Sequence, residues 1–355
     1  MSPLTSAPRG ACVRLWHTRG DWSQPTTRHL SATLLTLVLA AHAGGTAAAQ
    51  QVCRQSPTVA PALKRLRDAL AHGRFVSYEP TSLQVRDGRV TSADPQNIRA
   101  DLTLLREHFD ALVTYDAVHG AQAIAPIAAQ LKFRALIIGV WNPLDDTEVD
   151  AALASARKYP LLVAGVSLGN ETLFSQRSTV QQLAAVVTRV HALAPGLPLS
   201  STEPFHLYEK PAAAALLAQL DFLLVNVHPV FQSWFKQATE ATAAQFVLNV
   251  AGDLARTYCG PILIKETGVP TAPAESGYTS ARQASFYREL AARMPGTGTL
   301  AFAYFAAFDA PWRATDATGA PGPAGPHPEE AHWGLYDAEG HPKPVIEQLP
   351  ALKPQ

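Results

Sequence analysis

Eight short apolar runs recur between residues 74 and 309, and longer segments of helical periodicity separate them. Parallel strands that are buried on both faces read as unbroken apolar runs, and helical crossovers join them. This alternation predicts an α/β chain that folds as a single-domain (β/α)8 TIM barrel. The runs are RFVSYEP (74–80), ALVTYD (111–116), RALIIGVW (134–141), LLVAGVSLGN (161–170), PLSSTEP (198–204), DFLLVNVHP (221–229), PILIKETG (261–268) and LAFAYFAAFD (300–309).

Amphipathic segments lie between the runs, and one more precedes the first run. This first segment, 57–72, is expected to form a helix that closes the barrel floor. A doubly wound open sheet is the alternative fold. It would place a glycine-rich phosphate turn after an early strand, and YEPTSL (78–83) has no glycine. The other helical segments are predicted at 97–109, 180–193, 241–258 and 280–293, and from about residue 344.

Residues 1–49 differ in composition from the rest of the chain. They carry four arginines against a single acid, then an apolar run at 30–43 and a small-residue end, TAAAQ. This pattern predicts a signal peptide with a long basic leader, cleaved near Ala49, and a mature barrel domain of residues 50–355. The protein is then expected to be secreted or periplasmic, with no membrane part in its mature form. An uncleaved membrane anchor is the alternative, although the run is shorter than the roughly 20 residues of a span.

The charge balance limits the classes of partner, and the cysteine content bears on a disulfide. The chain has 29 basic and 29 acidic residues, and no basic stripe with interleaved aromatics, so no nucleic-acid partner is expected. Cys53 and Cys259 remain after the leader, and an even number in an exported chain permits a disulfide. Both cysteines directly precede elements at the barrel floor, where their side chains can meet and form a disulfide. Two buried free thiols are the alternative. We expect a monomer.

Two of the runs end in a glutamate set among small residues: Gly-Asn-Glu, ending at Glu171, and Glu-Thr-Gly, starting at Glu266. Because active sites of such barrels lie at the carboxyl ends of the strands, both side chains are expected at the mouth. They belong to the fourth and seventh strands, which face one another. A single strand-end glutamate is more commonly a salt-bridge partner, but a facing pair is suited to glycoside cleavage.

Other polar and aromatic residues at the strand ends are candidates to bind substrate. Asn170 can hold a sugar hydroxyl, or cap a helix. The tryptophans after residue 50 all follow strand ends, where a ring can stack on a sugar, although core packing is their usual role. Glu203 is a possible auxiliary acid or a structural carboxylate. No HExxH or CxxC motif is present, so no metal and no cofactor are expected. The substrate-binding candidates are Asn170, Tyr78, Tyr115, Asn226, His228, Trp141, Trp312 and Trp333.

These motifs resemble glycoside hydrolase family 17, whose barrel enzymes cleave or rearrange β-1,3-glucans. The resemblance runs from about residue 75 to 344. Three residues depart from the family pattern, namely Val269 in place of Trp, Ala310 in place of Glu and His228 in place of Tyr, which is typical of a divergent bacterial-type branch. The matching segments are Gly-Asn-Glu at 169–171, Glu-Thr-Gly-Val-Pro at 266–270, Asn-Val-His-Pro at 226–229, Phe-Asp-Ala-Pro-Trp-Arg at 308–313 and Gly-Leu at 334–335.

The resemblance implies roles for the two glutamates. Glu171 is the general acid/base and Glu266 the nucleophile of a secreted, retaining enzyme that hydrolyses β-glucan oligo- or polysaccharides. Transglycosylation of β-1,3-glucan is the alternative within the same chemistry, and a non-catalytic glycan-binding barrel is the alternative outside it. The loop at 315–334 is expected to lie over the cleft and to place Trp333 against substrate.

Overall fold

The computed structural model describes residues 51–86, 89–294, 296–315 and 327–352. The predicted leader at 1–49 and most of the predicted cleft loop lie outside these ranges. Within them, no helix is both long enough and apolar enough to cross a bilayer.

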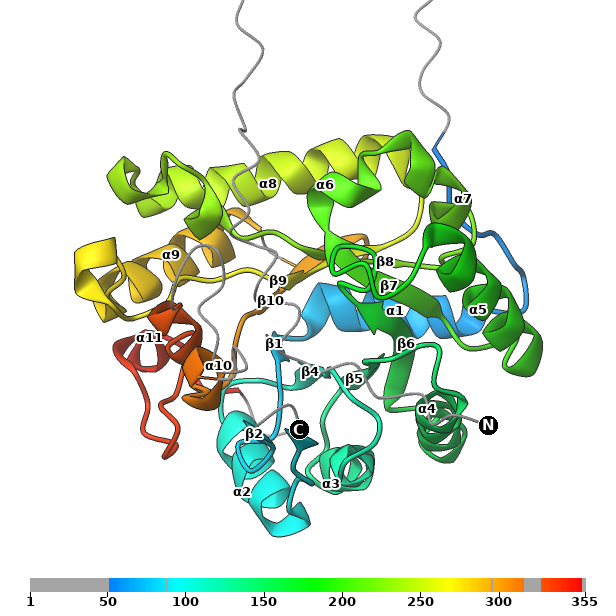
Figure 1. Ribbon diagram of the computed structural model, residues 1–355, viewed down its shortest axis with the longest axis horizontal. Helices are drawn as coiled ribbons and strands as arrows, with labels where there is room; N and C mark the ends of the chain where they lie inside the picture. Colours follow the sequence, from blue (N-terminus) through cyan, green and yellow to red (C-terminus); the bar gives the residue numbers. More distant parts are fainter. Residues whose placement is uncertain (1–50, 87–88, 295, 316–326, 353–355) are drawn as a thin grey trace, which may run out of the picture.

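Eight parallel strands close into a barrel in the spatial order β1-β10-β9-β8-β7-β6-β5-β4. Each strand lies inside one of the predicted apolar runs, so the predicted (β/α)8 fold is confirmed. Figure 1 shows the strands at the centre of the molecule, with helices around them. The strands are β1 (Phe75–Ser77), β4 (Ala111–Val113), β5 (Ala135–Val140), β6 (Val163–Asn170), β7 (Leu199–Pro204), β8 (Leu223–Asn226), β9 (Ile262–Glu266) and β10 (Leu300–Tyr304).

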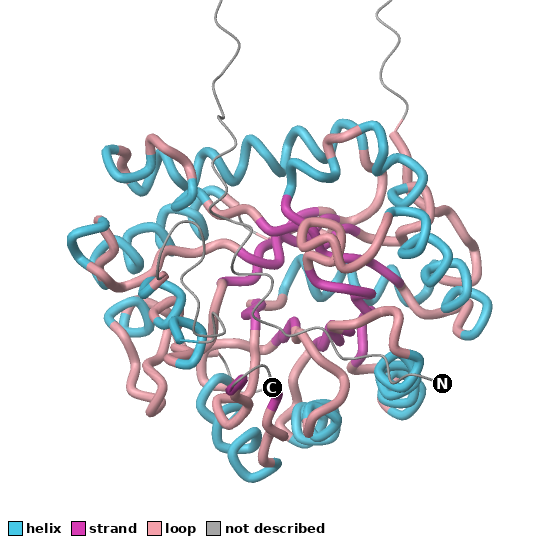
Figure 2. Tube along the Cα trace, viewed as in Figure 1, coloured by secondary structure: helices cyan, strands magenta, loops and turns pink. Residues whose placement is uncertain are grey.

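The helices form the outer layer of the barrel (Figure 2). Several begin at a side chain that accepts a backbone N–H bond, such as Asp94, Asp145 and Thr179, which satisfies donors that a helix start leaves open. The helices are α1 (Ala60–His72), α2 (Pro95–Leu105), α3 (Ile124–Gln130), α4 (Asp146–Lys158), α5 (Val180–Leu193), α6 (Phe205–Tyr208), α7 (Ala214–Leu217), α8 (Glu240–Thr257), α9 (Ser280–Arg293), α10 (Trp312–Thr315) and α11 (Pro344–Glu347). Short 3-10 helices are η3 (Ala121–Ala123), η4 (Pro211–Ala213), η5 (Pro229–Phe231), η6 (Phe235–Gln237), η7 (Ala274–Ser276) and η8 (Pro328–Ala331).

The barrel interior is filled by apolar side chains, and α1 closes its floor as the sequence predicts. Leu66 and Leu70 of α1 belong to the same buried cluster as Phe75, Leu224 and Leu263 on the strands. A second, larger cluster fills the layer between strands and helices. With the lower barrel packed, polar side chains can gather at the upper end, where the strands run out.

A short antiparallel hairpin, β2 (Val85–Arg86) and β3 (Arg89–Val90), follows β1 and was not predicted. Each of its strands has two residues, too few to show an alternation of apolar and polar positions.

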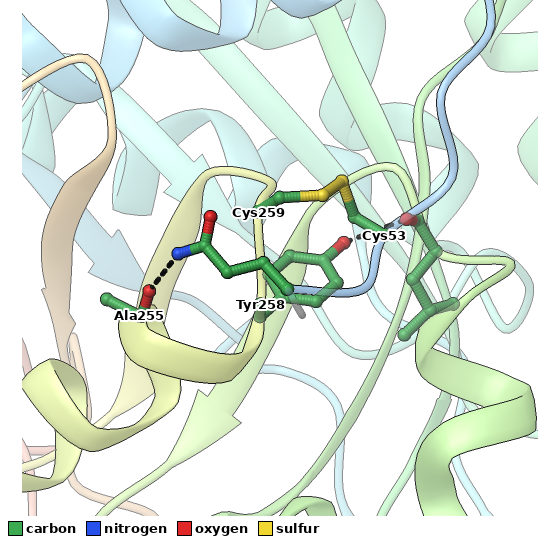
Figure 3. Close-up of a disulfide and its surroundings, with 6 residues drawn as sticks. Cys53, Ala255, Tyr258 and Cys259 are labelled. Carbon is green, nitrogen blue, oxygen red and sulfur yellow. Dashed lines mark hydrogen bonds between the residues drawn. A yellow bond between two sulfur atoms is a disulfide. The ribbon is translucent and has the colours of Figure 1, made fainter. Parts of the chain in front are cut away.

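A disulfide joins Cys53 to Cys259, 206 positions apart in the sequence (Figure 3). Beside it, Val52 exchanges backbone bonds with Thr257 and Cys259, and the Tyr258 hydroxyl donates to the carbonyl of Leu220. Because Cys259 lies just before β9, these contacts fix the segment that precedes α1 to the floor of the barrel.

Candidate active site

Glu171 directly follows β6, at a point where the backbone turns out of the strand. Gly169 has φ +91°, and a Cβ added there would lie 2.9 Å from the side chain of Thr172, so this position requires glycine. Glu171 itself has φ +52°, a conformation that is unfavourable for a residue with a side chain. Its amide donates to the carbonyl of Thr202 at 2.7 Å, and Asn226 Nδ2 donates to its Oε1 at 2.8 Å. The turn thus directs a buried carboxyl into the mouth.

Glu203, near the end of β7, holds the segment that follows Glu171 through hydrogen bonds to its backbone. Its carboxyl accepts bonds from the backbone amides of Leu173 and Phe174 and from the hydroxyl of Thr172. Burial raises the pKa of Glu203 to about 7, although these bonds and Arg177 act in the opposite direction. Of the two roles left open by the sequence, these contacts favour the structural carboxylate.

Arg177 fixes the other side of the same turn. Its Nη2 donates to the carbonyl of Asn170 at 2.5 Å and its Nη1 to the carbonyl of Trp141 at 3.0 Å. The guanidinium also lies over the Trp141 ring, 4.5 Å from the ring centroid. The half-buried Trp141 is therefore held beside the turn, with one ring face against Arg177.

Glu266 is the last residue of β9, and the side chains of His228 and Lys265 lie against its carboxyl. His228 Nε2 lies 3.4 Å from its Oε2 and Lys265 Nζ 3.5 Å from its Oε1. Burial alone would raise the pKa of Glu266, but the bond from His228 and the charges of Lys265, His228 and Arg313 outweigh it. The pKa is therefore below its ordinary value, which keeps this carboxyl ionised.

Asn226 connects the two glutamates. It lies in register with Glu266 across β8 and β9, and its side-chain amide donates to Glu171. The ends of β6 and β9 therefore meet in one site.

Several buried polar atoms of this site have no hydrogen-bond partner among the described residues. They are the Tyr115 hydroxyl, Asn226 Oδ1 and Glu266 Oε1. Buried polar atoms are rarely left unpaired, so these atoms are suited to a ligand that carries many hydroxyl groups. Asn170, 7% exposed, lies in the same site, where its Oδ1 accepts a bond from Lys265.

A cavity of about 760 Å³ extends from Tyr115 toward the loops that follow β1 and β10. Trp312 lines it, as does the ion pair between Glu79 and Arg313, whose charged atoms are 2.7 Å apart. Trp312 is thus placed where a ring can contact a bound sugar.

One predicted substrate-binding residue, Tyr78, is not in the mouth, and this prediction is wrong in this structure. Tyr78 is fully buried, and its hydroxyl donates to Asp101 of α2 at 2.9 Å. Successive side chains of a strand point to opposite faces, so Tyr78 faces the helices whereas Ser77 faces the interior. Trp333 is 2% exposed and packs against His228 and Phe305, with ring centroids 5.2 Å apart in each pair. Trp333 therefore borders His228, which contacts Glu266, and its contact with substrate stays a prediction.

Sequence reasoning missed Lys265 and Arg177. A lysine inside the otherwise apolar run PILIKETG was a signal for the first; Arg177 lies in a polar loop and gave none. The segment GVSLG (165–169) also matches the Gly-x-Ser-x-Gly pattern of a serine nucleophile. Ser167 is buried in β6 and its hydroxyl is bonded to Thr202 and to the carbonyl of Gly169, so it has no such role.

Known proteins resemble this chain in sequence and in fold. The model of the BtgE/BtgC glycoside hydrolase domain matches residues 76–334. A glucan 1,3-beta-glucosidase of Arthroderma benhamiae is 28% identical over 269 residues, which are 70% of this chain and 84% of that protein.

Among solved structures, the glycoside hydrolase family 17 beta-1,3-glucanosyltransferase from Rhizomucor miehei superposes with a TM-score of 0.59 at 20% identity, over 76% of this chain and 95% of that one. An active-site mutant of the R. miehei enzyme in complex with laminaritriose gives a TM-score of 0.60 at 20% identity, over 77% and 96% of the two chains. These structures share the barrel fold. The family match, which covers the strands that carry both glutamates, shows that the chain belongs to the BtgE/BtgC glycoside hydrolase domain family, and the predicted resemblance to family 17 is confirmed.

Proposed function

We propose that the protein hydrolyses β-1,3-glucan with retention of anomeric configuration, through a covalent intermediate on Glu266. The contact that carries the proposal is the bridge by Asn226, which brings Glu171 and Glu266 into one buried site. The family match supports the glycosidase activity. The names of the A. benhamiae and R. miehei proteins support β-1,3-glucan as the substrate.

In the first step, the carboxylate of Glu266 attacks the anomeric carbon while Glu171 gives a proton to the glycosidic oxygen. The bond between that carbon and oxygen breaks, and the leaving sugar departs as an alcohol. In the second step, Glu171 takes a proton from water as its oxygen attacks the same carbon, which releases Glu266. Two inversions at one carbon give net retention.

The surrounding residues suit the two carboxyls to these different tasks. Lys265 and His228 stabilise the negative charge that Glu266 needs for attack. Asn226 fixes the orientation of Glu171 through a neutral amide. Asn170 and the Tyr115 hydroxyl lie where they can bond sugar hydroxyls.

The test is incubation with laminarihexaose, followed by sizing of the products and NMR of the first anomer released. Shorter products with the β-anomer first are expected. Longer products would instead assign transglycosylation, in which a second sugar accepts the intermediate from Glu266. Binding without any product would favour a glycan-binding barrel, and no effect on any β-glucan would contradict the proposal.

We also propose that residues 1–49 direct export and are removed, which leaves a secreted or periplasmic enzyme. The disulfide between Cys53 and Cys259 supports this, because such bonds persist in oxidising compartments. Sequencing the N-terminus of the exported protein should find a start near Gln50. Recovery of the intact leader in a membrane fraction would support the uncleaved anchor instead.

A further inference from the structure

A buried lysine lies directly under the proposed catalytic centre. Lys265 is 1% exposed and is the residue before Glu266 on β9. Leu263, two positions earlier, belongs to the barrel interior, and alternate residues of a strand share a face. The Lys265 side chain therefore points into the top of the barrel rather than toward the helices.

The ammonium group of Lys265 contacts three parts of the site. Its Nζ donates to Asn170 Oδ1 at 2.6 Å, lies 3.5 Å from Glu266 Oε1 and lies 3.9 Å from the centroid of the Tyr115 ring. It thereby joins the end of β6 to the end of β9 from below, whereas Asn226 joins them through Glu171. Taking an ammonium group out of water is costly, and an apolar side chain would fill the same space without that cost. This position is therefore better explained by a role in the site than by stability.

The contact with Asn170 decides which way the asparagine amide points. A lysine ammonium can only donate hydrogen bonds, so it requires the amide oxygen on its own side. The amide NH2 group then faces away from Lys265. In a retaining glycosidase, a donor to the 2-hydroxyl of the sugar is most valuable in the transition state.

Resting on the proposed function, we propose that Lys265 is a positioning residue: it orients the Asn170 amide so that its NH2 group donates to the sugar 2-hydroxyl, and it couples that amide to the nucleophile Glu266. The occupant so recognised is a sugar with a free hydroxyl beside its anomeric carbon. Lys265 itself does not touch the substrate.

A second consequence concerns pH. The charged and titratable groups around Glu266 are Lys265 on β9, His228 after β8, Arg313 on α10 and Tyr115 after β4, with Glu171 across Asn226. Removing one positive charge from this set makes the Glu266 carboxyl easier to protonate. The acidic limb of the activity profile should then move to higher pH.

The test compares an aryl β-glucoside with its 2-deoxy analogue, in wild type and in Lys265→Met. In wild type, loss of the hydroxyl should lower kcat/KM by about 10-fold or more through the lost transition-state bond. In Lys265→Met this penalty should shrink to about 2-fold, since the amide is no longer held. The acidic limb of the pH–activity profile should move to higher pH by about one unit, as expected for loss of a neighbouring positive charge. Lys64→Met, an exposed lysine on α1 at the floor, is the matched control and should behave as wild type.

Asn170→Asp separates the role of the amide from the stability of the lysine variant. The carboxylate can still accept from Lys265 but has no NH2 group, so the 2-deoxy penalty should shrink here too. A full wild-type penalty in Asn170→Asp, or an unchanged penalty and pH limb in Lys265→Met, would overturn the inference while the glycosidase assignment stands. If wild type cleaved no β-glucoside, the proposed function itself would fail.

Discussion

The two strands that position the proposed catalytic glutamates, β6 and β9, end in different ways. At β6 the strand ends at Asn170, and Glu171, the next residue, stands in a left-handed conformation. Glu203 and Arg177 hold that turn through its backbone atoms. At β9 the strand continues to Glu266, which is in register with Asn226 on the neighbouring strand.

The difference extends to the electrostatics of the two carboxyls. Asn226 gives Glu171 a neutral donor, whereas Lys265 places positive charge beside Glu266 and His228 lies 3.4 Å from its other oxygen. A group that must hold, give and regain a proton is suited to the first setting, and a group that must stay ionised is suited to the second. The two strand ends thus provide the two different settings that the proposed roles require.

The strongest test of this comparison removes the glutamate of β9. Glu266→Ala should lower turnover by about 10⁴-fold or more, because no covalent intermediate can form. Added azide should then yield the α-glycosyl azide from an activated β-glucoside, since the small anion occupies the space of the lost carboxylate. Formation of the β-azide by this variant would reverse the roles of the two strand ends.

Removal of the glutamate of β6 should have a smaller and more selective effect. Glu171→Ala should lose about 10²- to 10⁴-fold on natural β-glucan, as is typical when a general acid is removed. Cleavage of an aryl glucoside with a good leaving group needs little protonation and should suffer far less. Azide should give the β-azide here. Equal losses on both substrates would contradict the acid role of Glu171.

Glu203, which supports the turn after β6, should affect how the free energy of unfolding depends on pH. The pKa of Glu203 is raised to about 7 from its ordinary 4.5, so between these values the folded protein binds this proton more tightly than the unfolded chain. The free energy of unfolding should therefore fall as pH rises from about 4.5 to about 7, by up to about 3 kcal/mol from this group. In Glu203→Gln this contribution is absent. Urea unfolding at pH 5 and pH 8 measures the free energy of unfolding of wild type and Glu203→Gln. An equal change between the two pH values in both proteins would exclude the contribution of Glu203.

The smallest effect is expected at the aromatic edge of the β6 turn. Trp141→Ala should raise KM for laminarihexaose by about 5- to 10-fold with kcat nearly unchanged, since stacking of a half-buried ring contributes about 1 kcal/mol. Steady-state kinetics measures this. A fall in kcat with constant KM would show instead that Trp141 acts on the catalytic turn through Arg177.

Much of the fold and the two glutamates could be predicted from the sequence, because each depends on local pattern. Burial on both faces makes a strand visibly apolar, and a polar residue where such a run stops lies at the mouth. The pattern does not show whether a given side chain points into the barrel or toward the helices. Tyr78 and Ser77 are neighbours at the end of one strand, yet only Ser77 faces the barrel interior, where its hydroxyl donates to the carbonyl of Lys265.

Trp333 shows a similar limit of the sequence pattern. Its position after the last strand is compatible with stacking on sugar, but the pattern does not show that its ring packs against His228 and Phe305 in the folded chain. The contact between Lys265 and Asn170 joins residues 95 positions apart and arises only when the barrel closes. Contacts between residues so far apart cannot be predicted until the order of the strands in the barrel is known.

The disulfide determines how the enzyme would be presented if any segment before Gln51 were retained. Cys53 is bonded to the foot of β9, and the glutamate at the other end of β9 lies at the opposite face of the barrel. A tether attached at this end of the chain would leave from the floor. It would therefore hold the open cleft away from the surface to which it is fixed, accessible to long glucan chains rather than pressed against that surface.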